Sequence, residues 1–302
     1  MPHDWFTGPA VDRQALFGPD AYVPDPALKD AVDLALYLDM PLLLTGEPGT
    51  GKTQLAEKLA RDLHVDLQRF ETRSVSQAQD LLYQFDPVAR FHAAGMGESL
   101  DPLRFVDYGP LGRAMLQGME KAEARKWFPN GGLPGWCAEN QPPRRAVVLI
   151  DEIDKAPTDF PNDLLTELER HEFRVREHDA NAKLEANPAH RPIVIITSNE
   201  ERTLPDAFLR RCVFFHLEPM PRDRLAKITR ARLDKAGLKL AEARLNEALD
   251  LYEHLRSDDL DLRKKPSTAE FLAFAAVLAR RGGEVGALRP VLVKTVEDAQ
   301  RG

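Results

Sequence analysis

The sequence predicts an α/β fold in which a five-stranded parallel sheet is followed by a small all-helical domain. Short apolar runs alternate with helical patterns through residue 218 of the 302 residues, and this alternation is typical of a parallel sheet covered by helices. A glycine-rich phosphate-binding pattern directly follows the first apolar run. Beyond residue 218 the apolar periodicity is helical only.

Five apolar runs are predicted to be buried strands because each is short and lies between turn residues or helical patterns. They cover residues 41–45, 67–72, 146–150, 192–197 and 213–217. A helix is predicted over residues 54–63, directly after the glycine-rich loop. Parallel sheets of this kind bind ligands beyond the carboxyl ends of their strands, so functional residues are expected where these runs end.

A domain boundary is predicted near Pro219, which separates a core, residues 1–218, from a helical lid, residues 219–302. The lid contains helical patterns over residues 222–236, 241–256 and 267–281. Within the core, residues 126–143 form a Pro- and Gly-rich surface excursion. Its two tryptophans either anchor the loop or contact a partner, and anchoring is the favoured interpretation.

Composition limits the function classes. The net charge is −7 and the pI is near 5.7, which argues against a general nucleic-acid-binding surface, because such proteins usually carry a basic stripe. No apolar stretch is long enough to span a membrane, and the first residues lack the features of a signal peptide. Cys137 and Cys212 have no CxxC partner and are expected to be reduced thiols. A cytoplasmic soluble protein is predicted.

The phosphate-binding loop is the strongest chemical signal. It reads Gly46-Glu47-Pro48-Gly49-Thr50-Gly51-Lys52-Thr53. A strand that enters a glycine turn and then a helix directs backbone N–H groups and a helix N-terminus at one point, where a triphosphate can lie. Lys52 is then expected to reach the β- and γ-phosphates, and Thr53 to hold Mg²⁺.

Two adjacent carboxylates follow the third apolar run. Asp151 and Glu152 come directly after residues 146–150. At the end of a buried strand, Asp151 can hold Mg²⁺ through water, and Glu152 can orient and activate the attacking water of a nucleotide hydrolase. The alternative, two solvated acids at a strand end, is disfavoured by the glycine-rich loop upstream.

Polar residues also follow the fourth run and precede the fifth. Asn199 could contact the γ-phosphate or the attacking water as a neutral hydrogen-bond donor, although asparagine at a strand end is often only a turn former. Arg210 and Arg211 end a short helical segment. A guanidinium supplied in trans can stabilise charge in phosphoryl transfer, and the alternative is a solvated pair at a helix end.

In their order along the chain, these motifs resemble the Walker A, Walker B, sensor 1 and arginine-finger positions of an AAA+ ATPase. The resemblance implies the strand order 5-1-4-3-2, ATP and Mg²⁺ as ligands, a nucleotide at a subunit interface, and a homo-oligomeric ring that is usually hexameric. It favours Arg211 as the finger, with Arg210 as the second candidate.

Further segments resemble one branch, the MoxR-type ATPases. Residues 105–111 are similar to the exit from that branch's helix-2 insertion, which would cover residues 85–104. Residues 163–169 resemble the branch's helix after Walker B, and residues 172–176 its β-hairpin. The resemblance suggests a protein partner that carries a von Willebrand factor A domain.

The lid departs from the family pattern. Ala269 stands where the family places its sensor 2 arginine. Either Arg263, Lys264 or Lys265 substitutes for it, or the lid is only weakly coupled to the γ-phosphate. Lys265 is the retained candidate, and plain surface charge is its alternative interpretation. Near the other end, Tyr22 and Val23, just upstream of the first helix, resemble the apolar segment that contacts adenine, and simple core packing is the equal alternative.

These features lead to three functional hypotheses. The leading one is an ATP-driven machine that remodels or matures a partner protein; the sequence contains no NKxD-like segment, which favours ATP over GTP. A nucleic-acid motor or loader is disfavoured by the acidic charge. A nucleotide switch without hydrolysis is disfavoured because Lys52, Thr53, Asp151 and Glu152 are all present.

Overall fold

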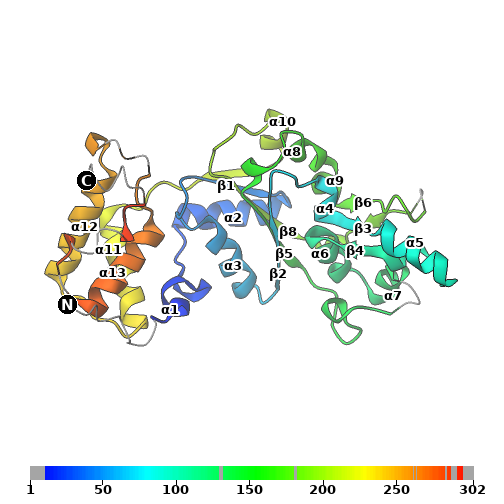
Figure 1. Ribbon diagram of the computed structural model, residues 1–302, viewed down its shortest axis with the longest axis horizontal. Coiled ribbons are helices and arrows are strands. Elements are labelled where there is room, and N and C mark those ends of the chain that lie inside the picture. Colours follow the sequence, from blue (N-terminus) through cyan, green and yellow to red (C-terminus); the bar gives the residue numbers. More distant parts are fainter. Residues whose placement is uncertain are drawn as a thin grey trace. The chain divides into compact units, whose positions relative to one another are not determined.

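The computed structural model describes residues 11–128, 132–179, 182–260, 262, 264–282, 284–286 and 291–294 (Figure 1). The chain forms two compact units. The sheet unit comprises Pro24–Gly46 and Leu55–Leu217, and the lid unit comprises Met1–Val23, Glu47–Gln54 and Glu218–Gly302. The phosphate-binding loop after Gly46 therefore belongs to the same unit as the C-terminal helices.

The sheet unit contains the five predicted strands. They are β1 (Leu42–Thr45), β2 (Asp66–Glu71), β5 (Ala146–Asp151), β8 (Ile193–Thr197) and β9 (Val213–His216). All are parallel, in the order β2-β5-β8-β1-β9. This is the order 5-1-4-3-2 read from the opposite edge, so the predicted fold class and strand order are confirmed.

Helices cover both faces of this sheet. Leu43 and Ile196 point to the face that shares a core with Leu111 and Met115 of α6 (Pro110–Gly118). The strand residues that alternate with them, such as Ile195, pack with side chains of α2 (Pro26–Leu38) and α3 (Lys52–Asp62). Because both faces are covered, the central strands β1, β5 and β8 are buried and almost wholly apolar, which is why they could be recognised in the sequence. The edge strand β2 differs, since it carries Asp66, Gln68 and Arg69 and is only half-buried.

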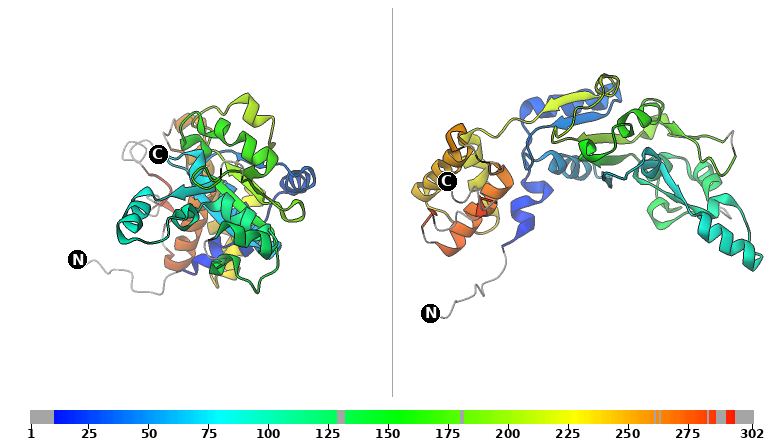
Figure 2. Two further views of the ribbon diagram at one scale, coloured as in Figure 1. Left: turned by 90° about the vertical axis from the view of Figure 1, so that its right-hand side faces the viewer. Right: turned by 45° about the horizontal axis from the view of Figure 1, so that its top comes forward.

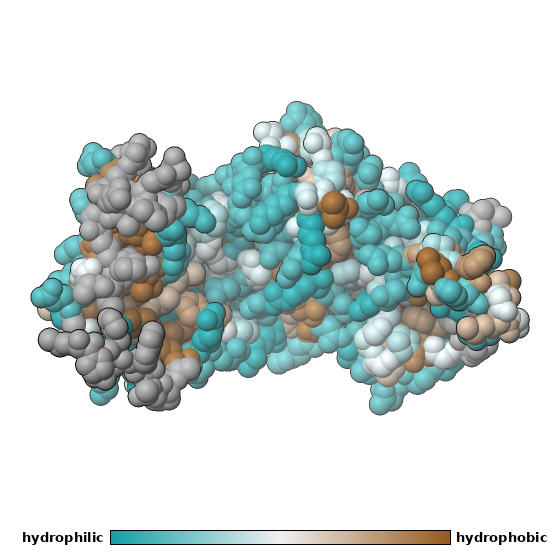
Figure 3. All heavy atoms as spheres, in the orientation of Figure 1, coloured by the Kyte–Doolittle hydropathy of each residue, from teal (hydrophilic) through white to brown (hydrophobic). Residues whose placement is uncertain are grey.

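The predicted insertion begins at the last residue of one unpredicted strand, Phe85, and the rest of it lies between that strand and a second unpredicted one. β3 (Tyr83–Phe85) and β4 (Val106–Tyr108) pair antiparallel after α4 (Ala78–Leu82). Between them are α5 (Pro87–Met96) and η2 (Pro102–Phe105), and α5 is the cyan helix at the far end of the sheet unit (Figure 2). Val88, Phe91 and Met96 of α5 are 62%, 77% and 74% exposed. The space-filling view shows apolar side chains at this end (Figure 3).

The Pro- and Gly-rich excursion is anchored by its own aromatic residues. It contains η3 (Arg125–Trp127) and η5 (Gly135–Cys137) and follows α7 (Lys121–Ala124), while residues 129–131 lie outside the described residues. The Tyr108 hydroxyl donates to the Trp127 carbonyl at 3.0 Å, and the rings of Phe128 and Trp136 meet edge to face at 5.9 Å. The favoured interpretation of the two tryptophans is confirmed.

Short elements connect β5 to β9. They are η6 (Ile153–Lys155), α8 (Phe160–Asp163), α9 (Leu165–Arg170), β6 (Glu172–Phe173), β7 (Leu184–Glu185), η7 (Pro188–His190) and α10 (Asp206–Leu209). Residues 163–169 are thus divided between two helices that meet at Leu164. The expected hairpin is present, because β6 and β7 pair antiparallel.

The lid unit contains the three predicted helices, each within one residue of its expected bounds. They are α11 (Arg222–Lys235), α12 (Glu242–Arg256) and α13 (Thr268–Arg281), with η8 (Asp258–Leu260) before α13. Leu225, Leu249 and Phe271 belong to their common core. Buried Arg232 donates to the carbonyls of Leu16 and Ala21, which attaches the N-terminal segment to α11.

One expectation about this segment was wrong. Tyr22 does not precede the first helix, because α1 (Arg13–Phe17) and η1 (Pro19–Ala21) come before it. The five-residue α1 is too short for a periodic apolar pattern, which explains why it was missed.

Both cysteines are free thiols, as expected. Burial raises the pKa of the Cys212 thiol to about 12, so this thiol stays protonated and weakly reactive at neutral pH. Within the described part of the chain, every helix is too short or too polar to cross a lipid bilayer.

Candidate functional site

The two predicted carboxylates lie where β5 ends, beside the end of β8. Asp151 is the last residue of β5, and Thr197 is the last residue of β8. The buried Thr197 hydroxyl donates to Asp151 Oδ1 at 2.5 Å and accepts the Glu152 backbone N–H at 2.9 Å. One side chain therefore joins the two strand ends and fixes both acidic residues.

Glu152 is held in an uncommon conformation. Its backbone is left-handed, with φ 56° and ψ 53°, which non-glycine residues adopt infrequently. Glu152 Oε1 accepts a hydrogen bond from Asn199 Nδ2 at 3.1 Å, and its other carboxylate oxygen pairs with the Lys155 ammonium. The hydrogen bond to Glu152 raises the pKa of Lys155. Lys155 is therefore a cation at neutral pH, and two donors orient the Glu152 carboxylate.

Buried Asp154 positions Asn199. Asp154 is 2% exposed, and its Oδ2 accepts the backbone N–H groups of Asn199 and Glu201, both at 3.1 Å. This fixes the turn after β8. Sequence reasoning did not identify Thr197 or Asp154. A threonine that ends an apolar strand and a second acid two residues after Glu152 were the available signals.

The phosphate-binding loop has the backbone that its glycines require. Gly46 has φ 132°, and a Cβ there would lie 2.5 Å from the Leu217 carbonyl oxygen, so only glycine fits. The Glu47 carbonyl accepts the Lys52 ammonium at 3.0 Å and the Thr50 hydroxyl at 2.9 Å. These bonds close the loop on one carbonyl directly before the start of α3.

Residues from both ends of the chain surround this loop within the lid unit. A Cβ on Gly51 would lie 2.8 Å from Tyr22 Cε2, and one on Gly49 would lie 2.5 Å from Ser267 Cβ and 3.8 Å from Ala269 Cβ. Tyr22 and Ala269, the two positions that the family resemblance singled out near the nucleotide, therefore lie beside the loop.

The remaining candidate nucleotide-binding residues of the lid unit are more exposed. Val23 is 57% exposed, and its carbonyl accepts from Arg224. Lys265 is half-buried and directly precedes Pro266. Arg263 lies outside the described residues, and Thr53 is the half-buried second residue of α3.

The two arginines lie elsewhere in the sheet unit. Arg210 and Arg211 follow α10 and precede β9, so they are at the amino-terminal edge of the parallel sheet, whereas Asp151 is at the carboxyl-terminal edge. A four-residue strand is about 13 Å long. Arg211 donates to Glu169 Oε2 at 3.0 Å, and both arginines line a pocket of about 380 Å³. The sheet unit brings together Asp151, Glu152 and Asn199, but not the arginines.

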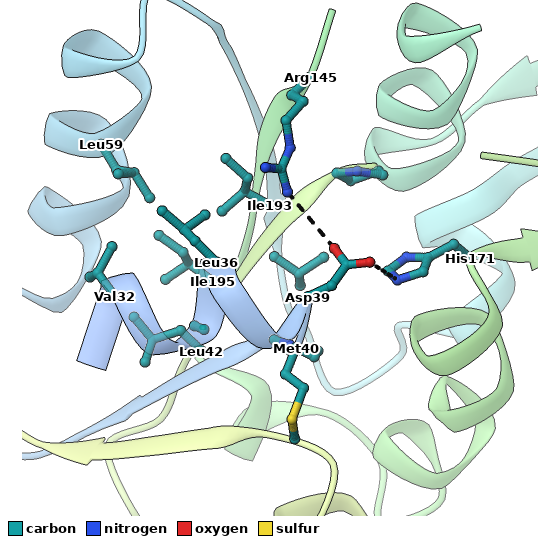
Figure 4. Close-up of a pocket in the computed structure, with 14 residues that line it drawn as sticks. Val32, Leu36, Asp39, Met40, Leu42, Leu59, Arg145, His171, Ile193 and Ile195 are labelled. Carbon is teal, nitrogen blue, oxygen red and sulfur yellow. Dashed lines mark ion pairs between the residues drawn. The ribbon is translucent and has the colours of Figure 1, made fainter. Parts of the chain in front are cut away.

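A smaller cavity, of about 20 Å³, lies among α2, α3 and the amino-terminal ends of β1 and β8 (Figure 4). Its wall is apolar except for Asp39, Arg145 and His171. Asp39 pairs with His171 at 3.4 Å, with Arg145 at 3.8 Å and with Arg191 at 2.5 Å. Burial lowers the pKa of His171. The cavity is far too small for a nucleotide, and its ion pairs hold the end of α2 against neighbouring segments.

Comparison with known proteins identifies a family. Residues 41–212, more than half of the chain, match the family described as AAA domain (dynein-related subfamily). Among solved structures, domain III of the replication initiation protein DnaA from Thermotoga maritima is 13% identical, with a TM-score of 0.46 and coverage of 95% of this chain and 100% of that chain. A proline-to-glycine mutant of RuvB from Thermotoga maritima is 13% identical, with a TM-score of 0.45 and coverage of 91% and 85%. No curated protein matches.

Proposed function

Because the chain belongs to the AAA domain family (dynein-related subfamily), we propose that it is an ATPase that works as a homo-oligomer and remodels a partner protein. The observation that carries this proposal is the arrangement of Asp151, Glu152 and Asn199 around Thr197. The Asp151 carboxylate is fixed by the buried Thr197 hydroxyl, and the adjacent Glu152 carboxylate is oriented by two donors. Carboxylates held in this way suit the activation of a water molecule better than solvated acids would.

The phosphate-binding loop is assigned to the polyphosphate of ATP. Its backbone N–H groups and the Lys52 ammonium would hold the phosphates. Tyr22, packed beside Gly51, is assigned with Val23 to the adenine side. Lys265 stays a candidate for contact with the terminal phosphate from the lid.

Thr53 and Asp151 are assigned to Mg²⁺. Carboxylate and hydroxyl oxygens are ligands that Mg²⁺ prefers, so this donor set fits the ion. When bound, Mg²⁺ would neutralise charge on the β- and γ-phosphates.

Glu152 is assigned as the general base. A water would attack the γ-phosphorus while the bond from that phosphorus to the bridging β-phosphate oxygen breaks, which releases ADP and phosphate. The Glu152 carboxylate would take a proton from the attacking water, and Asn199 would orient the carboxylate and the water. The Asn199 and Lys155 contacts support this role, because they restrict the rotation of the carboxylate.

The arginines are assigned to a neighbouring subunit. Arg211, with Arg210 as the alternative, lies at the sheet edge opposite Asp151, which favours action on another subunit's nucleotide. Because the arginines would act on a neighbouring subunit, we propose that the subunits form a ring, which the family resemblance suggests is hexameric. The exposed apolar side chains of α5, in the segment that resembles the MoxR-type insertion, support contact with a protein partner. A von Willebrand factor A domain remains the proposed partner class.

Steady-state phosphate release at several protein concentrations tests this function. Activity per subunit should rise with concentration as subunits assemble, and Arg211→Ala should lower kcat by about 10³-fold. Mixing Arg211→Ala with Glu152→Gln should restore part of the activity, because some interfaces then combine an intact Glu152 with an intact Arg211. Activity per subunit that is independent of concentration would contradict assembly, and absence of phosphate release would favour a switch.

A further inference from the structure

One lid side chain is fixed against the phosphate-binding loop. Arg256, the last residue of α12, donates from Nη2 to Glu47 Oε2 at 2.7 Å and from Nη1 to the Pro266 carbonyl at 2.8 Å. Its guanidinium carbon lies 5.7 Å from the centre of the Tyr252 ring. The Arg256 side chain is only 15% exposed. A long, flexible side chain is therefore held on three sides.

Its partner Glu47 carries a negative charge within the loop. The Glu47 side chain is 47% exposed, while its carbonyl accepts from Lys52 and Thr50. A carboxylate beside a polyphosphate raises the cost of binding it, because like charges repel. An adjacent guanidinium offsets this repulsion. Oε2 is the Glu47 carboxylate oxygen that accepts the hydrogen bond from Arg256.

We propose that Arg256 is a positioning residue for the nucleotide, which acts by neutralising Glu47 and thereby couples the lid helices to the phosphate-binding loop. The inference rests on the proposed function. We assign Arg256 to act through Glu47 rather than as a phosphate ligand, because one of its terminal nitrogens already donates to Glu47 and the other to the Pro266 carbonyl, which fixes the guanidinium against the loop. Ala269, beside Gly49, supplies no charge, whereas Arg256 of α12 is a lid cation that is hydrogen-bonded to the loop.

A double-mutant cycle tests the proposal. Affinity for the slowly hydrolysed analogue MgATPγS is measured by isothermal titration calorimetry for wild type, Arg256→Gln, Glu47→Gln and the double variant. Arg256→Gln should weaken binding by about tenfold, because residues in one charge network typically couple by this order. Glu47→Gln alone should bind slightly more tightly than wild type. The double variant should recover most of the affinity lost in Arg256→Gln.

Recovery of affinity in the double variant distinguishes the proposal from its alternatives. If Arg256 contacted phosphate directly, or only supported the fold of the lid, removing Glu47 would not restore binding, and a double variant as weak as Arg256→Gln overturns the proposal. Arg256→Lys should retain intermediate affinity. Salt should change this loss only slightly, because the Arg256 side chain is only 15% exposed and partly buried charges are screened much less than exposed ones.

Two controls complete the design. Arg222 of α11 pairs with Asp250 and Glu253 of α12, so Arg222→Gln removes a lid ion pair without touching Glu47 and should leave MgATPγS affinity unchanged. Thermal unfolding without nucleotide verifies that each variant folds. If Arg256→Gln does not fold, the Glu47→Gln variant still tests the proposal. Weaker MgATPγS binding by Glu47→Gln than by wild type overturns it. A wild-type protein that does not bind MgATPγS refutes the proposed function instead.

Discussion

The carboxylates and the phosphate-binding loop are held in different ways. Asp151 and Glu152 are fixed inside the sheet unit by a neighbouring strand, through one buried hydroxyl. The loop is contacted by lid residues far along the chain, since Glu47 and Arg256 are 209 residues apart. We infer that the chemical step depends on the rigidity of the sheet, whereas nucleotide affinity is set by the lid. Each prediction below tests one side of this contrast.

The largest effect is expected on the sheet side. Glu152→Gln keeps the shape and the Asn199 contact but removes the base, so kcat should fall by about 10²- to 10⁴-fold. Nucleotide affinity should change little, because the loop lies in the other unit. Phosphate release and calorimetric binding measure the two quantities, and normal turnover would refute the assignment of Glu152.

On the lid side, Gly49→Ala should weaken nucleotide binding by at least about tenfold. Gly49 has φ 80°, and the added Cβ would lie 2.5 Å from Ser267 Cβ, so either the loop or the start of α13 must move. MgADP titration measures the change.

The matched control is Gly237→Ala. Gly237 is in the same unit with φ 69°, but an added Cβ meets nothing within 4 Å, so only the backbone cost applies, about 1 kcal/mol of stability. Adding Ser267→Gly to Gly49→Ala should restore part of the affinity. Equal binding by the Gly49 and Gly237 variants would argue against the lid contact.

Two buried threonines, Thr197 in the sheet unit and Thr229 in the lid unit, allow the stability contribution of a hydroxyl to be compared between the units. Thr197→Val leaves the Glu152 N–H and the Asp151 carboxylate without the hydroxyl, and the free energy of unfolding should fall by about 1–3 kcal/mol. Thr229 of α11 donates only to the Leu225 carbonyl one turn earlier, so Thr229→Val should cost less than about 1 kcal/mol. Urea unfolding measures the free energy of unfolding of both variants. Equal losses of stability would mean that the Thr197 hydroxyl contributes no more than the Thr229 hydroxyl.

The smallest effect concerns pH. Burial lowers the pKa of His171 in the folded state, while Asp39 opposes this shift and Arg191 and Arg145 add to it. As the pH falls, His171 therefore takes up a proton more readily in the unfolded chain than in the folded protein. Stability should fall as pH decreases through and below about 6.5, the usual histidine value.

His171→Gln should make this dependence shallower. The free energy of unfolding, followed through the emission of Trp127 and Trp136 in the sheet unit, is compared between about pH 7.5 and about pH 5.5. An unchanged slope in the variant would assign the acid sensitivity to other groups.

The sequence predicted the parts of this protein that follow from local pattern. Strands buried on both faces are continuous apolar runs, and the helices of the lid repeat their apolar residues at helical spacing. β3 and β4 were missed because three residues are too few to show a period. Asp151, Glu152 and Asn199 could be singled out as candidates because they closely follow predicted strands.

Thr197, Asp154 and Arg256 were not found, because their importance comes from partners distant in sequence. Thr197 binds residues about 45 positions away, and Arg256 a loop 209 positions away. Chemical type alone did not distinguish them from ordinary residues of a strand or a helix end. The roles of all candidate residues in hydrolysis stay predictions.

The shared hydroxyl of Thr197 also limits which sequences this site can tolerate. Valine keeps the shape but lacks the donor and acceptor, asparagine and aspartate are poor strand formers, and only serine and threonine offer a hydroxyl at that distance from the backbone. Threonine additionally suits a strand because it is β-branched. In a library that randomises position 197 and selects for turnover, threonine should dominate, serine should survive weakly, and the other residues should be lost.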